Sequence, residues 1–150
     1  MPVSNIPMKI TLKNFQKKIP IPRGRIFKAA KAAFRKFHPD SRFAQSGSRD
    51  PSEASVGIVF VGPKRMRAIN KKYLNHDYVT DVLTFDLGDN IGEIIICPRL
   101  AAAQAQAHQT STENEIILYV IHGILHLAGY DDHSSKDKIQ MRRMENELMK

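Results

Sequence analysis

The residues best suited to chemistry are His122 and His126, which lie four positions apart in an apolar stretch. Residues with this spacing on a helix share one face, so both imidazoles can reach the same ion. The predicted helix is apolar nearly all round, and a buried imidazole needs a hydrogen-bond partner or a metal. A histidine pair satisfied by hydrogen bonds within the core has the same spacing, so spacing alone leaves both interpretations open.

The residues that follow favour the metal. Gly129 is placed to end the helix, and four residues with polar side chains, 130–133, come after a sharp turn. A helical histidine pair with a third ligand just beyond the helix is typical of open catalytic sites, where water completes the coordination. We expect one divalent ion, zinc first, although other transition metals use the same donors. The expected ligands are His122, His126 and either Asp132 or His133.

Gly123 limits the chemistry of this site. In zinc proteases of the H-E-x-x-H type, the residue after the first histidine is a glutamate that acts as general base. Gly123 has no side chain to do this, which argues against a protease of that type, and any general base must lie elsewhere. Glu115 and Tyr119 belong to the same helical stripe as the histidines. We expect them to orient a histidine or to line the mouth of the site.

Positive charge is concentrated in the first third of the 150 residues. Residues 1–50 hold 12 of the 23 Lys and Arg but only two of the 15 acids. Such a segment gains affinity for polyanions by counterion release, so nucleic acid is the first candidate partner, and a solvated surface is the alternative. No apolar run approaches the roughly 20 residues that cross a bilayer, and no signal-peptide core is evident. With a single cysteine, Cys97, which we expect to be buried and inert, the chain is expected to be cytoplasmic.

Hydrophobic periodicity and turn signals predict an order of β-α-β-α-β-β-α-α-α. This order predicts one α+β domain over residues 1–150, with a small mixed β-sheet of about four strands packed with about five helices. The metal-binding helix and loop of this domain are expected to span about 113–133. Thr110, Ser111 or Thr112 can cap the helix, and Thr112 and Glu115 have the spacing of a capping box. The expected strands are at about 8–13, 55–61, 80–85 and 92–97, the helices at about 21–37, 63–74, 98–108, 112–128 and 135–148, and the main loop at 40–54.

The segment from His122 to Asp131 resembles the hallmark of the YbeY family, H-G-x-L-H-L-x-G-Y-D-H, at every fixed position up to that aspartate. Further segments similar to the family lie upstream in the expected order, so the resemblance covers about residues 56–148. It implies a cytoplasmic hydrolase, a metal-dependent endoribonuclease that acts on single-stranded RNA in rRNA maturation and ribosome quality control. The implied partners are rRNA and ribosomal or ribosome-assembly proteins, with no membrane. The upstream segments are 69–73, 77–85 and 92–96.

Two positions depart from the family pattern. The family's third histidine falls in ungapped register on Asp132, with His133 one place later, so the third ligand stays open between them. Many members carry an arginine directly after the tyrosine equivalent to Tyr73, where this chain has Leu74. An arginine there can bind a scissile phosphate, whereas leucine cannot.

Three alternatives follow from these observations. A metal-dependent hydrolase of another substrate would use the same site, and a non-enzymatic ribosome-assembly factor would use the metal as a structural element. A general nucleic-acid-binding module would bind RNA without the metal. In the endoribonuclease, cations of the first third, with Arg65 and Arg67, are expected to contact the RNA backbone. No aromatic-rich stacking sheet is evident, so sequence-specific base readout is not expected.

Overall fold

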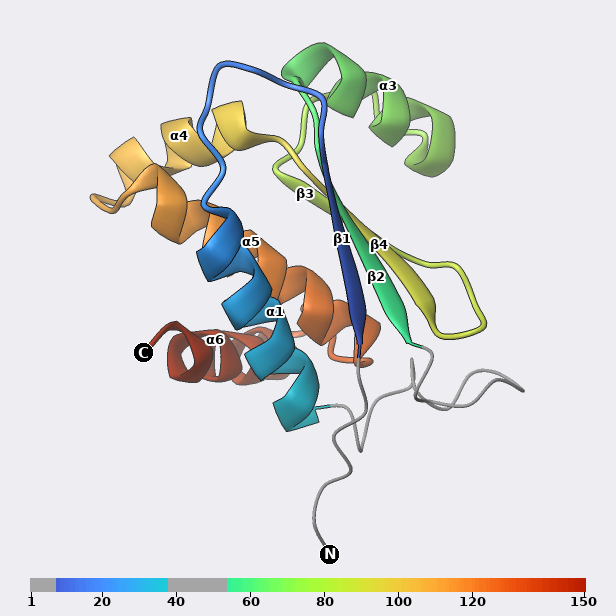
Figure 1. Cartoon of the computed structure of the whole chain (residues 1–150), viewed down its shortest axis with the longest axis vertical. Helices are drawn as coiled ribbons and strands as arrows, with labels where there is room; N and C mark the ends of the chain where they lie inside the picture. Colours follow the sequence, from blue (N-terminus) through green and yellow to red (C-terminus); the bar gives the residue numbers. More distant parts are fainter. Residues whose placement is uncertain (1–7, 38–53) are drawn as a thin grey trace, which may run out of the picture.

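A four-stranded mixed sheet lies at the centre of the computed structural model, which describes residues 8–37 and 54–150 (Figure 1). The strand order is β1-β2-β4-β3. β1 and β4 both run parallel to β2, while β3 pairs antiparallel with β4. The prediction of a small mixed sheet is therefore confirmed. The strands are β1 (Lys9–Asn14), β2 (Ser55–Phe60), β3 (Val82–Asp86) and β4 (Ile91–Ile96).

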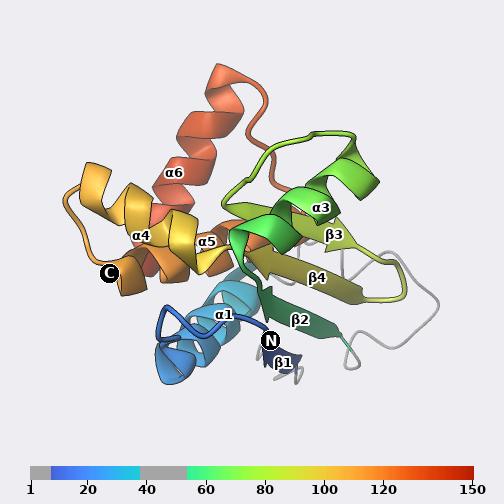
Figure 2. The same ribbon diagram turned by 90° about the horizontal axis from the view of Figure 1, so that it is seen from above.

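Five helices accompany the sheet within the described residues, as expected for an α+β fold. The helices α1 and α5 pack against each other on one face of the sheet, and α3 packs against the other face (Figures 1 and 2). The predicted loop at 40–54 falls almost wholly outside the described residues. The helices are α1 (Arg23–Phe37), α3 (Pro63–Leu74), α4 (Pro98–Ala107), α5 (Thr112–Leu127) and α6 (Ser135–Met149).

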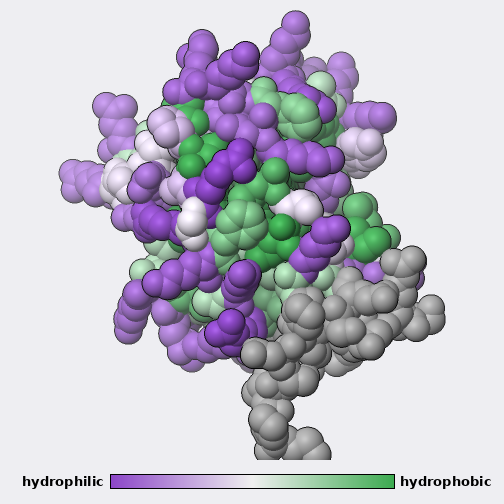
Figure 3. All heavy atoms as spheres, viewed as in Figure 1, coloured by the Kyte–Doolittle hydropathy of each residue, from purple (hydrophilic) through white to green (hydrophobic). Residues whose placement is uncertain are grey.

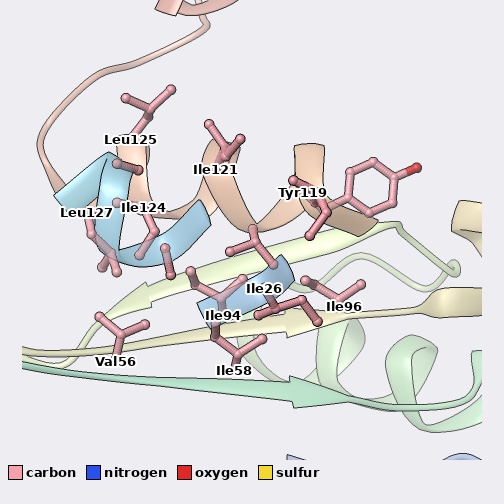
Figure 4. Packing of buried hydrophobic residues seen from close by; sticks show 14 of the residues in the cluster. Ile26, Val56, Ile58, Ile94, Ile96, Tyr119, Ile121, Ile124, Leu125 and Leu127 are labelled. Atoms are coloured by element: carbon pink, nitrogen blue, oxygen red, sulfur yellow. The ribbon is translucent and has the colours of Figure 1, made fainter. Parts of the chain in front are cut away.

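The main core lies between the sheet and α5 (Figure 4). Alternate residues of β2, Val56, Ile58 and Phe60, are buried on this side, as strand geometry requires. Because α5 contacts the sheet, α1, α4 and α6, it needs apolar side chains almost all round. Each large aliphatic side chain buried here contributes about 1.5–3 kcal/mol relative to exposure. The helix that carries the histidine pair is thus the best anchored helix of the fold.

Two glycines allow α5 to lie unusually close to β4. A Cβ added to Gly123 of α5 would stand 2.7 Å from Cδ1 of Ile94, whose side chain is fully buried. A Cβ added to Gly92 of β4 would stand 2.6 Å from Cδ1 of Leu127. Carbon atoms in contact are normally about 3.5–4.0 Å apart, so each glycine makes room for an aliphatic side chain of the facing element.

The ends of α5 are fixed by local hydrogen bonds. The hydroxyl of Ser111 accepts from the backbone N–H of Asn114, so Ser111 is the N-cap. Ser111 was one of the three residues expected to cap this helix. The capping box predicted from the spacing of Thr112 and Glu115 is not formed, because the cap lies one residue earlier. At the other end, Gly129 has φ 101°, its N–H bonds the carbonyl of His126, and Tyr130 N–H bonds that of Leu125. This pair of bonds is a Schellman motif, which confirms that Gly129 ends the helix.

The face drawn in Figure 3 is mostly hydrophilic, with hydrophobic residues gathered near its middle, around β1 and α1. Two N-terminal cations are held by acids from the C-terminal half: Arg25 bonds Glu113, and Lys36 pairs with Glu147. Cys97 is fully buried, as expected. Among the described residues, no helix is long and apolar enough to cross a membrane.

Candidate metal centre

Three of the four expected ligands come together in the structure. His122 and His126 project from one face of α5, and Asp132 comes from the segment that the Schellman turn at Gly129 directs back toward them. Their side chains are partly exposed, at 23%, 26% and 40%. One donor atom from each residue lies within 4.8 Å of the others. The set is therefore accessible to an ion from solvent.

The three donor atoms fit a single divalent ion. The Nε2 atoms of the two histidines are 2.9 Å apart, and Oδ2 of Asp132 lies 3.6 Å from His122 Nε2 and 3.8 Å from His126 Nε2. A triangle with these sides has its corners about 2.0 Å from a common centre, and zinc bonds to nitrogen and carboxylate oxygen are about 2.0–2.2 Å long. Two imidazoles and a carboxylate are donors that zinc and other transition metals accept. Both the spacing and the chemistry of the set fit.

The outer nitrogens of both rings are also held. Nδ1 of His122 lies 2.6 Å from Oε1 of Glu145 in α6, a length at which the ring N–H donates to the carboxylate. His126 is held by a hydrogen bond with the backbone of Tyr130. A carboxylate behind a histidine fixes the tautomer that leaves Nε2 free for an ion. Glu145 was not predicted from the sequence, because nothing in local spacing links it to a histidine 23 residues earlier.

His133 lines a hollow together with both histidines, but its donor atoms do not group with theirs. Its side chain is 85% exposed and its Nε2 bonds Oδ1 of Asp131 at 3.2 Å. Asp131, Asp132 and His133 form a second group with donor atoms close together, on a largely exposed segment. Of the two alternatives for a third ligand, the structure brings Asp132 to the histidine pair.

The two histidines have pKa shifts of opposite sign. At His122, burial opposes the imidazolium, but the hydrogen bond and charge of Glu145, with the charge of Asp132, leave the pKa raised. Burial and the neighbouring His122 lower the pKa of His126. The opposite pKa shifts are consistent with one proton held between the two Nε2 atoms, on the side of His122. A bound cation would take the place of this proton.

The donor set lies in a cleft of about 520 Å³. Four of the described residues that line it are acids, and none is Lys or Arg, so a polyanion needs a cation there to bind. The expected placement of Glu115 and Tyr119 holds, since both line this cleft. Its polar lining as a whole comes from Asp81, Gln104, His108, Glu115, Tyr119, His122, His126, Asp132 and Glu145.

A second hollow of about 490 Å³ shares both histidines with the cleft. Leu74, at the end of α3, is 44% exposed and lines this hollow together with Thr84 and Asp86 of β3. Leu74 therefore lies in the same hollow as the histidine pair. A leucine there offers an apolar wall and no charge for a phosphate.

Comparison with known proteins agrees with this architecture. Residues 11–150 match the family described as endoribonuclease YbeY. A protein of that name from Flavobacterium psychrophilum is 39% identical over 106 residues, covering 69% of this chain and 76% of the relative. Another, from Macrococcus caseolyticus, is 35% identical over 119 residues, covering 71% and 77%. The solution structure of a Thermotoga maritima protein matches with a TM-score of 0.59 and 25% identity, covering 93% of this chain and 86% of that one.

Fold and site together define a small α+β protein in which a cleft joins two helix-borne histidines to an aspartate that follows the same helix. The match over nearly the whole chain gives the particular family. The chain belongs to the YbeY family, as its sequence motif predicted.

Proposed function

We propose that the protein is a metal-dependent endoribonuclease in which His122, His126 and Asp132 hold one divalent ion, zinc being the first candidate. Membership of a family described as endoribonuclease YbeY supports the activity. The observation that carries the metal assignment is the convergence of three donor atoms on a point about 2.0 Å from each, the bond length that zinc requires.

In this reaction, a bound divalent ion supplies Lewis-acid stabilisation to the charge that develops on a phosphodiester. The protein itself orients the ligand side chains and limits where phosphate can bind. Glu145 holds the ring of His122 by its Nδ1–H and keeps Nε2 directed into the cleft. The acids around the cleft repel phosphate that is not paired with a cation, so phosphate binding is restricted to the donor set.

The RNA backbone would bind to cations outside the cleft. Exposed lysines and arginines of α1 and α3 supply this charge, although Arg25, Lys36, Arg67 and Lys71 are engaged by acids. Such contacts are independent of sequence, and their affinity falls steeply with salt. We further propose single-stranded rRNA as the substrate, in rRNA maturation and ribosome quality control in the cytoplasm, alongside ribosomal or ribosome-assembly proteins.

The proposal is tested by incubating purified protein with a single-stranded RNA and with the same RNA in a duplex. We expect internal cleavage of the single strand, loss of cleavage with a chelator, and recovery when zinc or another divalent ion is added back. The variant His126→Ala should bind RNA and fail to cleave it. Cleavage that persists after complete metal removal would contradict the proposal.

Leu74 favours a second candidate, a non-enzymatic ribosome-assembly factor with a structural metal. Its side chain stands beside the histidine pair where a cationic group would assist phosphate chemistry. This candidate predicts a metal-loaded protein that binds RNA, cleaves none, and unfolds readily when His126 is replaced by alanine.

A further inference from the structure

The cleft extends along α5 beyond the donor set to an end built from α4 and α5. Glu115 and Tyr119 line this end with exposures of only 4% and 6%. They precede His122 by seven and three residues, about 10 and 4.5 Å along the helix. Nδ1 of His108, at the end of α4, lies 3.3 Å from Oε1 of Glu115, and Gln104 completes the lining. This end therefore carries polar groups within a nucleotide's reach of the donor set.

The hydroxyl of Tyr119 is buried beside Glu115, and it makes no short, well-aligned hydrogen bond to any of the described residues. It points away from the apolar cluster that surrounds the rest of the helix (Figure 4). Burial, followed by the charges of Asp81 and Glu115 and a weak hydrogen-bonding contact with Glu115, raises the pKa of Tyr119, so the hydroxyl keeps its proton. A buried polar group that is poorly paired costs free energy, and a ligand in the cleft would supply a better-aligned partner.

Charge decides what kind of ligand group fits. Glu115 is a buried carboxylate, and Asp81 lines the same cleft with no lysine or arginine among its described lining residues. A phosphate at this end would meet like charge in a partly buried place. A carboxylate accepts hydrogen bonds from neutral N–H and O–H groups, and a tyrosine hydroxyl both donates and accepts. RNA carries such neutral donors on its ribose hydroxyls and base edges.

We propose that Glu115, Tyr119, His108 and Gln104 form a nucleoside subsite, which accepts neutral hydrogen-bond donors of the nucleotide next to the phosphate at the donor set. This inference rests on the proposed function, because it takes RNA as the ligand. The donor is a ribose hydroxyl or a base N–H. The cleft, at about 520 Å³, lies within the range of roughly 300–1,000 Å³ found for small-molecule sites.

A structural role for the same cluster makes different predictions. If the contact between His108 and Glu115 served only to join α4 to α5, changing Glu115 would lower stability without a selective effect on RNA. If the Tyr119 hydroxyl were only an unsatisfied group, Tyr119→Phe would leave stability unchanged or raise it, with RNA affinity unaffected. Stability and RNA affinity must therefore be measured on the same variants.

The test compares Tyr119→Phe and Glu115→Gln with the controls Tyr73→Phe and Glu93→Gln. The Tyr73 side chain is exposed, and Glu93 lies on β4 outside the cleft lining. The probe is a labelled single-stranded RNA of about eight nucleotides, bound to metal-loaded protein and followed by fluorescence anisotropy. Metal content and the urea unfolding midpoint are measured for every variant. Tyr119→Phe should weaken RNA binding about 2- to 10-fold, with metal content retained and the midpoint unchanged or higher. Glu115→Gln should weaken it about 10-fold or more, and both controls should match wild type.

Modified oligonucleotides distinguish the two sources of the donor. If the donor is a ribose hydroxyl, single 2′-deoxy substitutions will weaken binding to wild type and have no further effect on Tyr119→Phe. If the donor is a base N–H, replacing guanosine by inosine will weaken binding to wild type and have no further effect on Tyr119→Phe. RNA affinity of Tyr119→Phe equal to wild type, or lost only in proportion to metal and stability, would overturn the subsite. Wild-type metal-loaded protein that neither binds nor cleaves RNA would overturn the proposed function itself, whatever the variants do.

Discussion

Replacing Gly123 by alanine tests how closely α5 must approach β4 for the two histidines to stay in place. The new Cβ would lie 2.7 Å from Cδ1 of Ile94 and 2.9 Å from both of its Cγ atoms. These distances are roughly 0.6–1.3 Å short of carbon contact distances. Because the Ile94 side chain is fully buried, it has little room to rotate away. Overpacking of this kind typically costs about 1–3 kcal/mol.

The same substitution brings a gain in helix propensity of about 1 kcal/mol, since glycine is unfavourable in a helix interior. The net expectation for Gly123→Ala is a loss of about 0–2 kcal/mol in the free energy of unfolding. In an Ile94→Ala background all three clashing atoms are absent, so Gly123→Ala should instead stabilise the protein by about 1 kcal/mol. The coupling between the two positions is then about 1–3 kcal/mol.

Urea unfolding of wild type, both single variants and the double variant measures this coupling. Ile94→Ala alone should cost about 2–5 kcal/mol, so Ile94→Val, which removes only the nearest atom, provides a milder second background with partial relief. Metal affinity should fall in Gly123→Ala, because a displaced α5 shifts His122, and should recover in the double variant. Equal effects of Gly123→Ala in every background would refute the close-approach explanation.

Three further predictions concern the surroundings of the donor set. Glu145→Gln should lower metal affinity about 10- to 100-fold while the protein stays folded, because the ring of His122 loses its carboxylate partner. Metal titration measures this, and unchanged affinity would show that Glu145 does not support the site. Leu74→Arg should tighten RNA binding and steepen its salt dependence by about one phosphate contact, measured over a salt series, and an unchanged slope would place this position outside the RNA path. The hydrogen bond from Arg67, and then its charge, holds the pKa of Asp77 below its ordinary value. The stabilisation is thus present at neutral pH and lost as pH falls through that pKa; in a carboxyl NMR titration, Arg67→Gln should raise the Asp77 pKa, and an unmoved pKa would exclude this pair.

The sequence was sufficient for features set by local physics. The spacing of His122 and His126 within an apolar helix, and the need for glycine in a left-handed turn at Gly129, both follow from helix geometry. The order of strands and helices was also predictable, since hydrophobic periodicity and turn signals together separate them.

Features set by tertiary packing were not predictable from one sequence. Glu145 approaches His122 only because α6 folds back against α5, and no local pattern encodes that contact. The choice between Asp132 and His133 depends on the direction of the chain after the Schellman turn, which spacing left open. Ser111 was one of three adjacent hydroxyl residues that can cap a helix, and local preference favours serine over threonine without fixing the helix start. Gly123 had a visible chemical consequence, but its packing against Ile94 needed the sheet.

The most direct measurement for the central claim is the metal content of protein purified without chelator, determined for wild type, His122→Ala, Asp132→Ala and His133→Ala. The arrangement of donor atoms predicts about one divalent ion per wild-type chain and per His133→Ala chain. It predicts strongly reduced metal in His122→Ala and Asp132→Ala, with all four proteins folded by circular dichroism. Wild type without stoichiometric metal, or a full complement in Asp132→Ala with loss in His133→Ala, would contradict it.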